Sequence, residues 1–377
     1  MVDRKYTQLI CWSTNDLKML NTATSGISSN IVYVLLIIGG FITLFSMYYK
    51  TSPMLPCQRQ PSYSVKNTAY SMANKPILLL WFWPENDRFD FKDCKTFFNI
   101  DGCNLTDNRT LYSEADAVLI FHRAINHNAS NLPPSPRPSF QKWIWFHVES
   151  PTNTQKVPGI ENLFNETLNY RQDADIPVHW KLSKKTRDDF ALPKKERMIC
   201  WIVSNNDSHT GTKMMYSYYR ELVKHIKVDV FGKVFGSFLK YKDYFSTIAS
   251  CKFYLSFENS VDKDYITEKL NGPLAAGTVP VVLGPSRQNY ESFIPGDSFI
   301  HVNDFPEAKA LADFLLQLDK NDEAYMRYFN WRQYYSARPH LIKQNRKFLQ
   351  AICYACDHVG RHREYRVVPD IYKWYFG

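Results

Sequence analysis

Short apolar segments separated by longer polar ones recur along the chain from residue 75 onward. Residues 75–84, 115–122 and 142–150 read KPILLLWFWP, ADAVLIFH and KWIWFHVES. Near-continuous apolar runs of this length are typical of strands buried on both faces of a parallel sheet. Amphipathic or loop segments, including the proline-rich NLPPSPRPS, lie between them. This alternation predicts a first α/β domain.

A second series of apolar segments begins near residue 197, after a polar and charged junction over residues 180–196. Helical periodicity covers residues 211–226, 265–277, where Gly277 ends the helix, and 305–335. Five further strands are predicted at residues 197–204, 227–232, 251–258, 278–284 and 298–302. The pattern predicts two Rossmann-like α/β halves, and the cleft between two such halves is the default ligand site.

The most apolar segment of the chain is IVYVLLIIGGFITLFSMYY, residues 31–49, which contains no charge. At about 1.5 Å per residue, a helix of this length matches the hydrocarbon core of a bilayer. A buried core helix seldom lacks a polar face for so long, and a signal peptide has a shorter apolar region. The segment predicts a single transmembrane helix, preceded by a cytoplasmic tail at residues 1–30 and followed by a flexible stem at residues 50–75.

Cysteines and glycosylation sequons after this segment indicate an oxidising lumen. An even number of cysteines favours disulfides, although Cys353 and Cys356 with His358 also resemble half of a zinc site. Five Asn-x-Ser/Thr sequons add weak support. The even set is the six cysteines Cys94, Cys103, Cys200, Cys251, Cys353 and Cys356, because Cys11 and Cys57 lie outside the expected folded region. The sequons begin at Asn104, Asn108, Asn128, Asn165 and Asn206.

Composition narrows the class of ligand. The 45% of apolar residues provide for a large core, and the formal charge of +9 favours an anionic ligand or a membrane surface. No lysine- or arginine-rich stripe with interleaved aromatic residues is present, which argues against nucleic acid as a partner.

The segment FENSVDKDYITEKL, residues 257–270, places polar residues between two core strands. A strand that leads through a loop into a helix N-terminus is where α/β domains bind phosphates. Lys269 can neutralise a diphosphate, Glu268 can accept hydrogen bonds from sugar hydroxyls, and Tyr265 offers a planar surface. A solvated helix start is the alternative interpretation of the same residues.

FYLSFENSVDKDYITEKL, followed by GTVPVVLGPSRQNYESFIPGDSFIHVNDF, resembles the signature of the α1,3-fucosyltransferases, glycosyltransferase family 10. The similarity extends over residues 77–377 and includes LLLWFWP, FQKWIWFHVESP, WIVSN, FNWR and CYACDHV. It implies a GT-B fold, with an acceptor domain at residues 76–190, a GDP-fucose domain at 191–350 and a C-terminal segment, 351–377, tied back to the first domain.

The resemblance also implies an activity and a compartment. The reaction would be inverting transfer of L-fucose from GDP-β-L-fucose to O3 of GlcNAc in N-acetyllactosamine glycans, with no cofactor or metal. The enzyme would be a single-pass type II Golgi membrane protein with a lumenal catalytic part. Whether it forms a homodimer is left open by the sequence.

The resemblance also implies roles for the residues of this sequence that match the family's motifs. Glu149 of the Glu-Ser-Pro motif corresponds to the general base, a role that needs one carboxylate at the acceptor hydroxyl. Because Glu149 ends the apolar run WIWFHVE, we expect it at the end of a strand. Donor contacts fall on Ser204, Asn205, Asn259, Tyr265, Glu268 and Lys269.

Two regions depart from the family pattern. The helix after WIVSN lacks the family's phosphate-binding arginine, and Lys213 is the nearest cation that could replace it. Acceptor choice is expected at His122 and Arg123, where an arginine resembles enzymes that use type 2 chains, but the adjacent Phe121 and Ala124 differ from the family pattern. The family's disulfides correspond to Cys94–Cys353, Cys103–Cys356 and Cys200–Cys251.

Two rival functions remain. Asp173 and Asp175 form a DxD motif, as in metal-dependent GT-A glycosyltransferases, but they lie in a polar loop before Ile176. A non-catalytic lumenal sugar-binding protein could also keep this fold.

Overall fold

The computed structural model describes residues 75–184, 190–204, 211–340, 348–362 and 364–377. Within these ranges no helix is long and apolar enough to cross a bilayer. The predicted membrane helix at residues 31–49 lies outside them, as do the predicted tail and most of the stem.

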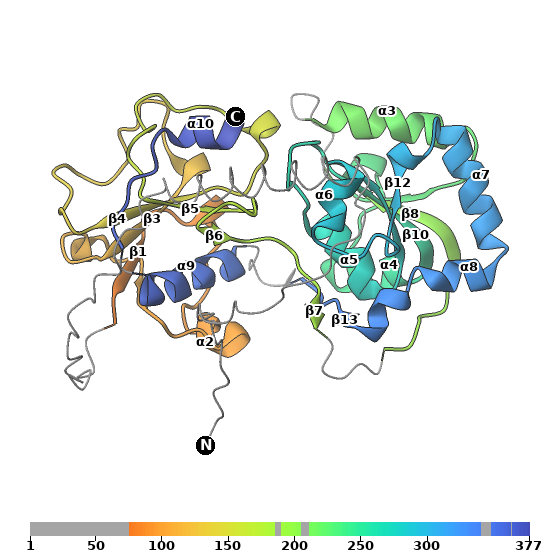
Figure 1. The fold of residues 1–377 in the computed structure, drawn as a ribbon, viewed down its shortest axis with the longest axis horizontal. Helices are drawn as coiled ribbons and strands as arrows, with labels where there is room; N and C mark the ends of the chain where they lie inside the picture. Colours follow the sequence, from red (N-terminus) through yellow and green to blue (C-terminus); the bar gives the residue numbers. More distant parts are fainter. Residues whose placement is uncertain (1–74, 185–189, 205–210, 341–347, 363) are drawn as a thin grey trace, which may run out of the picture. The chain divides into compact units, whose positions relative to one another are not determined.

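Two parallel sheets confirm the predicted α/β class (Figure 1). The first sheet has the strand order β2-β1-β3-β4-β5-β6, and the second has the order β12-β11-β10-β8-β9. The first comprises β1 (Ile77–Leu80), β2 (Asn104–Thr106), β3 (Ala117–Phe121), β4 (Lys142–Phe146), β5 (Glu166–Asn169) and β6 (Ile176–Pro177). The second comprises β8 (Arg197–Ile202), β9 (Asp229–Phe231), β10 (Cys251–Phe257), β11 (Val279–Leu283) and β12 (Ile300–His301). A short antiparallel pair, β7 (Ser183–Lys184) with β13 (Tyr335–Ser336), lies outside both sheets.

In each sheet the first strand in the sequence lies between the second strand on one side and the third strand on the other. The chain therefore adds one strand on one side of the first and all later strands on the opposite side. The switch point lies between β1 and β3 in the first sheet and between β8 and β10 in the second. Ligands of open α/β sheets bind at the carboxyl ends of the strands at such a point. The segments that follow β1, β3, β8 and β10 are therefore where binding residues are expected.

The first sheet is covered on both faces by helices from the far end of the chain (Figure 1). Leu78 and Leu80 pack with α9 (Leu349–Arg361), whereas Leu79, on the opposite face, packs in the cluster that contains α10 (Ile371–Phe376). This alternation follows from the period of two along a strand. We call this sheet, with α2 (Asp93–Phe98), α9 and α10, the first lobe.

The helices that cover the second sheet lie between its strands or soon after them in the sequence. We call this sheet, together with these helices, the second lobe. Helices α3 (Thr212–Leu222) and α7 (Ala308–Asp319) pack on one face, and α4 (Tyr244–Ala249) and α5 (Glu268–Ala276) pack on the other. The remaining helices are α6 (Arg287–Glu291) and α8 (Asp322–Arg327). The helical stretch predicted at 305–335 is divided, because the Asn321 side chain accepts a hydrogen bond from Ala324 N–H and starts a new helix, α8.

Single-turn 3-10 helices make up many of the connections. They are η1 (Pro84–Asn86), η2 (Arg109–Leu111), η3 (His122–Ala124), η4 (Pro151–Asn153), η5 (Lys233–Phe235), η6 (Tyr241–Asp243), η7 (Val302–Asp304) and η8 (Asn330–Gln333).

Three disulfides have the pairing that the resemblance implied: Cys94–Cys353, Cys103–Cys356 and Cys200–Cys251. The first two join α9 to the region of α2 and β2, with sequence separations of 259 and 253 residues. Because Cys353 and Cys356 are both oxidised, they do not supply thiolates for the zinc site considered above.

Candidate functional site

Glu149 lies in a loop and not at the end of a strand, which corrects our expectation. Strand β4 ends at Phe146, and Pro151 opens the 3-10 helix η4. The loop is nevertheless fixed, because His147 N–H donates to the Leu168 carbonyl and its ring Nε2 lies 2.7 Å from the Thr154 hydroxyl. The position of Glu149 therefore depends on this bonded loop.

Three donors orient the Glu149 carboxylate. The Tyr265 hydroxyl donates to Oε1 at 2.6 Å, and Ser150 N–H donates to the same oxygen at 3.1 Å. Arg123 Nη1 lies 3.7 Å from Oε2, and the Glu149 side chain is 21% exposed. These contacts fix the orientation of the carboxylate, whose oxygens are the proton-accepting groups of this loop.

The last helix of the chain also contacts the Glu149 loop. The Tyr375 hydroxyl donates to the Glu149 carbonyl, and the Tyr372 hydroxyl bonds with both N–H and C=O of Val157. Arg171 caps α10 by donating to the carbonyls of Trp374 and Tyr375. Helix α10 thus holds the backbone of the loop, while Tyr265 contacts the Glu149 side chain.

The side chains of His122 and Arg123 lie in different environments, although the two residues are adjacent in sequence. His122 is buried, with Nε2 3.0 Å from the Gln155 carbonyl, while Trp145 Nε1–H donates to Nδ1. Burial lowers the pKa of His122, which keeps the ring neutral. Arg123 is exposed and lies 3.5 Å from Glu85 as well as near Glu149. Of this predicted acceptor pair, Arg123 is the side chain available to a ligand.

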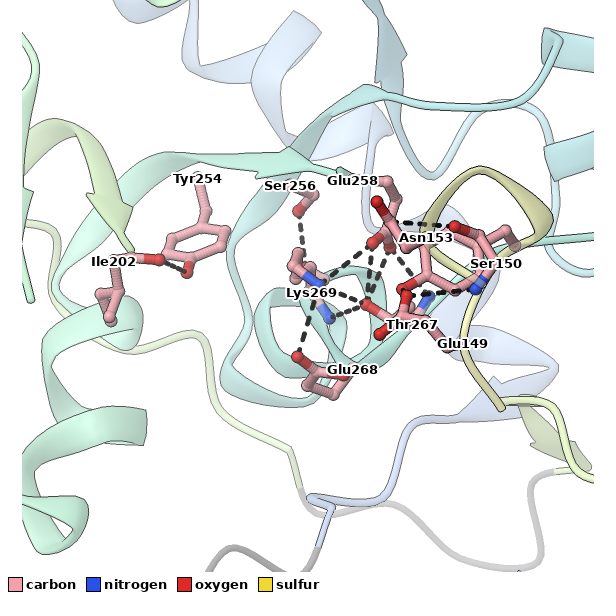
Figure 2. Close-up of polar contacts among 11 residues, drawn as sticks. Glu149, Ser150, Asn153, Ile202, Tyr254, Ser256, Glu258, Thr267, Glu268 and Lys269 are labelled. Carbon is pink, nitrogen blue, oxygen red and sulfur yellow. Dashed lines mark hydrogen bonds and ion pairs between the residues drawn. The ribbon is translucent and has the colours of Figure 1, made fainter. Parts of the chain in front are cut away.

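On the second lobe, Lys269 lies in the first turn of α5 at the carboxyl end of β10. Figure 2 shows dashed lines from Lys269 to Glu258, Thr267 and Glu268. Lys269 Nζ is 3.1 Å from Glu258 Oε2, 2.9 Å from Thr267 Oγ1 and 3.5 Å from Glu268 Oε1. Partial burial works against the charge, but the neighbouring carboxylates raise the pKa of Lys269. Lys269 is therefore a cation at neutral pH, and its side chain remains 32% exposed.

Glu258 is a site residue that our sequence analysis did not single out. It is fully buried and accepts hydrogen bonds from Thr267 N–H and Oγ1–H as well as from Lys269. Burial raises its pKa, and the adjacent Lys269 opposes that rise. A charged residue at the end of an otherwise apolar strand was the signal in the sequence, because such a group is rarely buried without a partner.

Pro273 inside α5 explains a further contact at Lys269. Proline has no N–H, so the carbonyl four residues earlier, that of Lys269, loses its helical partner. Ser256 on β10 replaces that partner with a 2.7 Å hydrogen bond from its hydroxyl to the Lys269 carbonyl. This bond fastens the first turn of α5 to the strand beside it.

The other predicted donor residues surround this turn. Ser204 follows β8 and is exposed, and Asn259 follows Glu258 with its buried Oδ1 lacking a hydrogen-bond partner. Gly211 brings the start of α3 against Asn259, since a Cβ there would lie 1.7 Å from the Asn259 carbonyl oxygen. Lys213, two residues on, is exposed and forms no ion pair with the described residues. Asn205 lies outside the described residues.

Two cavities adjoin the site. A cavity of about 370 Å³ is lined by Ser204 and Lys233, at the ends of β8 and β9, and by Glu268. A larger cavity, about 860 Å³, also reaches Glu268 and extends to the turn after β1. Its lining is rich in aromatic and charged side chains, among them Phe97, Trp180, Tyr354, Glu85, Asp87 and Lys181. Both volumes lie in the usual range for small-molecule sites or near it.

The DxD motif is engaged in structural contacts. Arg171 donates to both carboxylate oxygens of Asp173, at 2.8 and 2.7 Å. Asp175 accepts hydrogen bonds from Thr167 N–H and Oγ1–H and pairs with Arg366. Among the described residues, no group of three or more His, Cys, Asp or Glu side chains is arranged to hold a metal ion. The contacts of Asp173 and Asp175 therefore give the GT-A alternative no support.

One predicted glycosylation site is incompatible with the fold. Asn165 is fully buried, its Oδ1 accepts from Trp143 N–H, and its Nδ2 donates to the Arg366 carbonyl. A sequon shows only that an asparagine has the right neighbours, and burial of this one leaves no room for a glycan. Asn104, Asn108 and Asn128 are exposed, and Asn206 lies outside the described residues.

Comparisons with known proteins identify the family of this chain. Residues 73–181 match the family described as "Fucosyltransferase, N-terminal", and residues 192–374 match "Glycosyltransferase family 10 (fucosyltransferase) C-term". The chain is 44% identical to human 4-galactosyl-N-acetylglucosaminide 3-alpha-L-fucosyltransferase 9, over 95% of this chain and 100% of that protein. It is 41% identical to bovine 3-galactosyl-N-acetylglucosaminide 4-alpha-L-fucosyltransferase FUT3, over 82% of this chain and 84% of that protein.

A solved structure shares the fold. The crystal structure of an alpha1,3-fucosyltransferase with GDP-fucose matches with a TM-score of 0.50 and 16% identity, covering 78% of this chain and 92% of that one. At this identity the likeness concerns the fold alone, an α/β arrangement of the GT-B type. With two family matches that together cover most of the chain, and relatives above 40% identity over nearly its whole length, this chain belongs to glycosyltransferase family 10, the fucosyltransferases.

Proposed function

We propose that this chain transfers L-fucose from GDP-β-L-fucose to O3 of GlcNAc in N-acetyllactosamine glycans, with inversion at the fucose C1. One observation carries the proposal: a carboxylate of the first lobe, Glu149, is hydrogen-bonded to Tyr265 in the phosphate-binding segment of the second lobe. A base and a cationic nucleotide site are thereby adjacent, as a direct displacement requires. Relatives named for transfer to N-acetylglucosaminides support the choice of substrate.

The chemistry follows from these groups. Glu149 accepts the proton of the GlcNAc O3 hydroxyl while that oxygen attacks C1 of fucose on the face opposite GDP. The bond between C1 and the β-phosphate oxygen breaks, and its electron pair leaves with GDP. Lys269 stabilises the negative charge that grows on the diphosphate, with Lys213 as a second cation. GDP needs no proton to leave, so one base and one cationic site are sufficient.

The larger cavity suits the acceptor. Aromatic rings such as Trp180 and Phe97 offer flat apolar surfaces for sugar rings, and Glu85 and Asp87 accept hydrogen bonds from hydroxyls. Arg123 connects this cavity to the base, since its guanidinium lies near both Glu85 and Glu149. The smaller cavity, at the ends of β8 and β9, suits the nucleoside of the donor.

The decisive experiment is transfer from GDP-fucose to N-acetyllactosamine, with the linkage read by NMR. We expect an α1,3-linked product, with the same rate in EDTA. The type 1 disaccharide is a built-in control because galactose already occupies its O3, and it should yield no such product. The absence of product would refute the proposal, and if no GDP is released with or without acceptor, the non-catalytic sugar-binding alternative is favoured.

We further propose a single-pass type II orientation in the Golgi membrane, anchored by residues 31–49. The uncharged segment itself and three disulfides, which form in oxidising compartments, support this placement. Protease treatment of sealed microsomes should leave a C-terminal tag intact and remove an N-terminal one. Digestion of the C-terminal tag would refute this orientation, and absence from Golgi markers would refute the compartment.

A further inference from the structure

A turn over residues 262–265 in the second lobe contacts the loops of the first lobe. The Asp262 carboxylate accepts hydrogen bonds from both N–H (3.1 Å) and Oγ1–H (2.8 Å) of Thr152, which lies three residues after Glu149. The ring of Tyr265 packs edge-on against Tyr170, with ring centroids 5.1 Å apart. The segment that we assign to the donor is thus connected to the loop that carries the base.

Asp264 is the most constrained residue of this turn. Its side chain is buried and its backbone has a φ of 64°, a left-handed conformation that is unusual for a residue other than glycine. A buried carboxylate needs several donors to offset the loss of water. Residues that many bonds hold in a sparsely populated backbone conformation cluster at functional sites.

Those donors come from both lobes. Asn289, in α6 of the second lobe, donates from Nδ2 to Asp264 Oδ1 at 2.7 Å and accepts from Asp264 N–H at 2.7 Å. Gln172, in the turn before β6 of the first lobe, donates from N–H to Oδ2 at 3.1 Å and from Nε2 to Oδ1 at 3.2 Å. Gln172 Nε2 also donates to the Ser292 hydroxyl at 3.0 Å. The carboxylate of Asp264 is therefore the point at which the two lobes share a bonded network.

Asp264 directly precedes the tyrosine that contacts the base. Because four hydrogen bonds fix Asp264 and its left-handed φ sets the direction of the chain, the Tyr265 side chain leaves the turn in one orientation. That orientation brings its hydroxyl to 2.6 Å from Glu149 Oε1. A small rotation of the turn would move this hydroxyl away from the carboxylate.

We infer that Asp264 is a positioning residue for fucose transfer: through the Gln172–Asp264–Asn289 network it aims Tyr265, and Tyr265 aims the Glu149 carboxylate. The inference rests on the proposed function for its reaction but not for its geometry. Asp264 touches no substrate in this scheme. The Tyr265 ring, which the sequence suggested as a donor contact, is buried, and its hydroxyl bonds to Glu149. Loss of Asp264 therefore lowers the rate of the chemical step and leaves the affinity for GDP-fucose nearly unchanged.

The test uses Asp264→Asn, Tyr265→Phe and the double variant in the purified lumenal part of the chain that carries wild-type activity. Asparagine tolerates the left-handed backbone. Its amide NH₂ group would face the Gln172 N–H, so the hydrogen bond that Asp264 Oδ2 accepts from Gln172 is lost. Misplacement of a catalytic group by about 1 Å costs on the order of 10²-fold in rate, so we expect kcat to fall about 10- to 100-fold. KM for GDP-fucose should change less than about threefold. Asp313→Asn, on the exposed face of α7, is the control for loss of a carboxylate and should keep wild-type kinetics.

The kcat of the double variant, compared with those of the two single variants, distinguishes a positioning role of Asp264 from a role in stabilising the fold. If Asp264 acts through Tyr265, the double variant has about the same kcat as Tyr265→Phe alone. Effects that multiply, or a wild-type kcat in Asp264→Asn, would overturn the inference. If Asp264→Asn does not fold, Asn289→Ala removes two of the bonds instead, and the same non-additivity with Tyr265→Phe is expected.

A crystal structure of Asp264→Asn keeps this test independent of the substrate. The inference requires the distance from the Tyr265 hydroxyl to Glu149 to exceed hydrogen-bonding range, and an unchanged distance would overturn it. Failure of the wild-type protein to transfer fucose would instead count against the proposed function alone.

Discussion

Replacement of Glu149 by glutamine should abolish transfer and leave the protein folded and able to bind the donor. Glutamine keeps an oxygen that can accept from the Tyr265 hydroxyl and from Ser150 N–H, so neither buried donor loses its partner. The substitution removes the contact of Oε2 with Arg123, which is 3.7 Å long and involves a 52% exposed arginine. Such a pair contributes about 0–1 kcal/mol, so the free energy of unfolding should fall by no more than that.

The catalytic loss should be much larger. A general base contributes on the order of 10²–10⁴-fold, which corresponds to ~3–5 kcal/mol at 1.36 kcal/mol per tenfold. Alanine would be a poorer test, because it leaves the buried Tyr265 hydroxyl unpaired at a cost of about 1–3 kcal/mol. A fall in activity could then reflect misfolding.

Three measurements on Glu149→Gln decide the matter. Steady-state transfer to N-acetyllactosamine should fall at least about 100-fold, calorimetric affinity for GDP-fucose should stay within about twofold, and the melting temperature should stay near that of wild type. Glu114→Gln, an exposed position in the same lobe, is the matched control and should be fully active. Turnover of Glu149→Gln within about tenfold of wild type, with the correct linkage, would refute the base assignment.

Three further outcomes follow from the same contacts. Glycopeptide mass spectrometry of the protein expressed through the secretory pathway should find Asn165 unmodified, because its side chain is buried, whereas the exposed Asn128 is available; a glycan on Asn165 would contradict this packing. Glu258→Gln should raise KM for GDP-fucose on the order of tenfold, because it removes the buried carboxylate that holds Lys269; an unchanged KM would show that Lys269 needs no such support. Burial lowers the pKa of His179 to about 4, so the unfolded chain takes up a proton below about pH 6.5 that the folded chain does not. The urea midpoint should therefore fall as the pH drops from 6.5 towards 4, by an amount equal to ~1 kcal/mol at pH 5 after allowance for solvent screening, and His179→Gln should flatten that slope if the reasoning is right.

Local patterns in the sequence were sufficient for the second lobe and its binding segment. Strand β10, the turn after it and the helix that ends at Gly277 follow one another within a few residues, and each has a local cause. Gly277 adopts a φ of 75°, the left-handed value that ends helices. Lys269 and Glu268 therefore lie where their spacing predicted, in the first turn of α5.

The first lobe depends on contacts that no local pattern reveals. Its sheet is covered by α9 and α10, which follow it by nearly two hundred residues, so the apolar strands alone did not show what buries them. The burial of Asn165 has the same origin, since its partner carbonyl belongs to Arg366. The network of Asp264 likewise joins residues 172, 264 and 289, which the sequence keeps far apart.

The return of the C-terminal helices to the first sheet has a consequence for biosynthesis. The second lobe is contiguous in the chain and can assemble as soon as its last helix leaves the ribosome. The first lobe, although translated earlier, cannot complete its core until α9 and α10, which follow the second lobe in the chain, have been made. Until then the two apolar faces of the first sheet stay uncovered, and a truncation that removes α9 and α10 would damage the part of the protein that was made first.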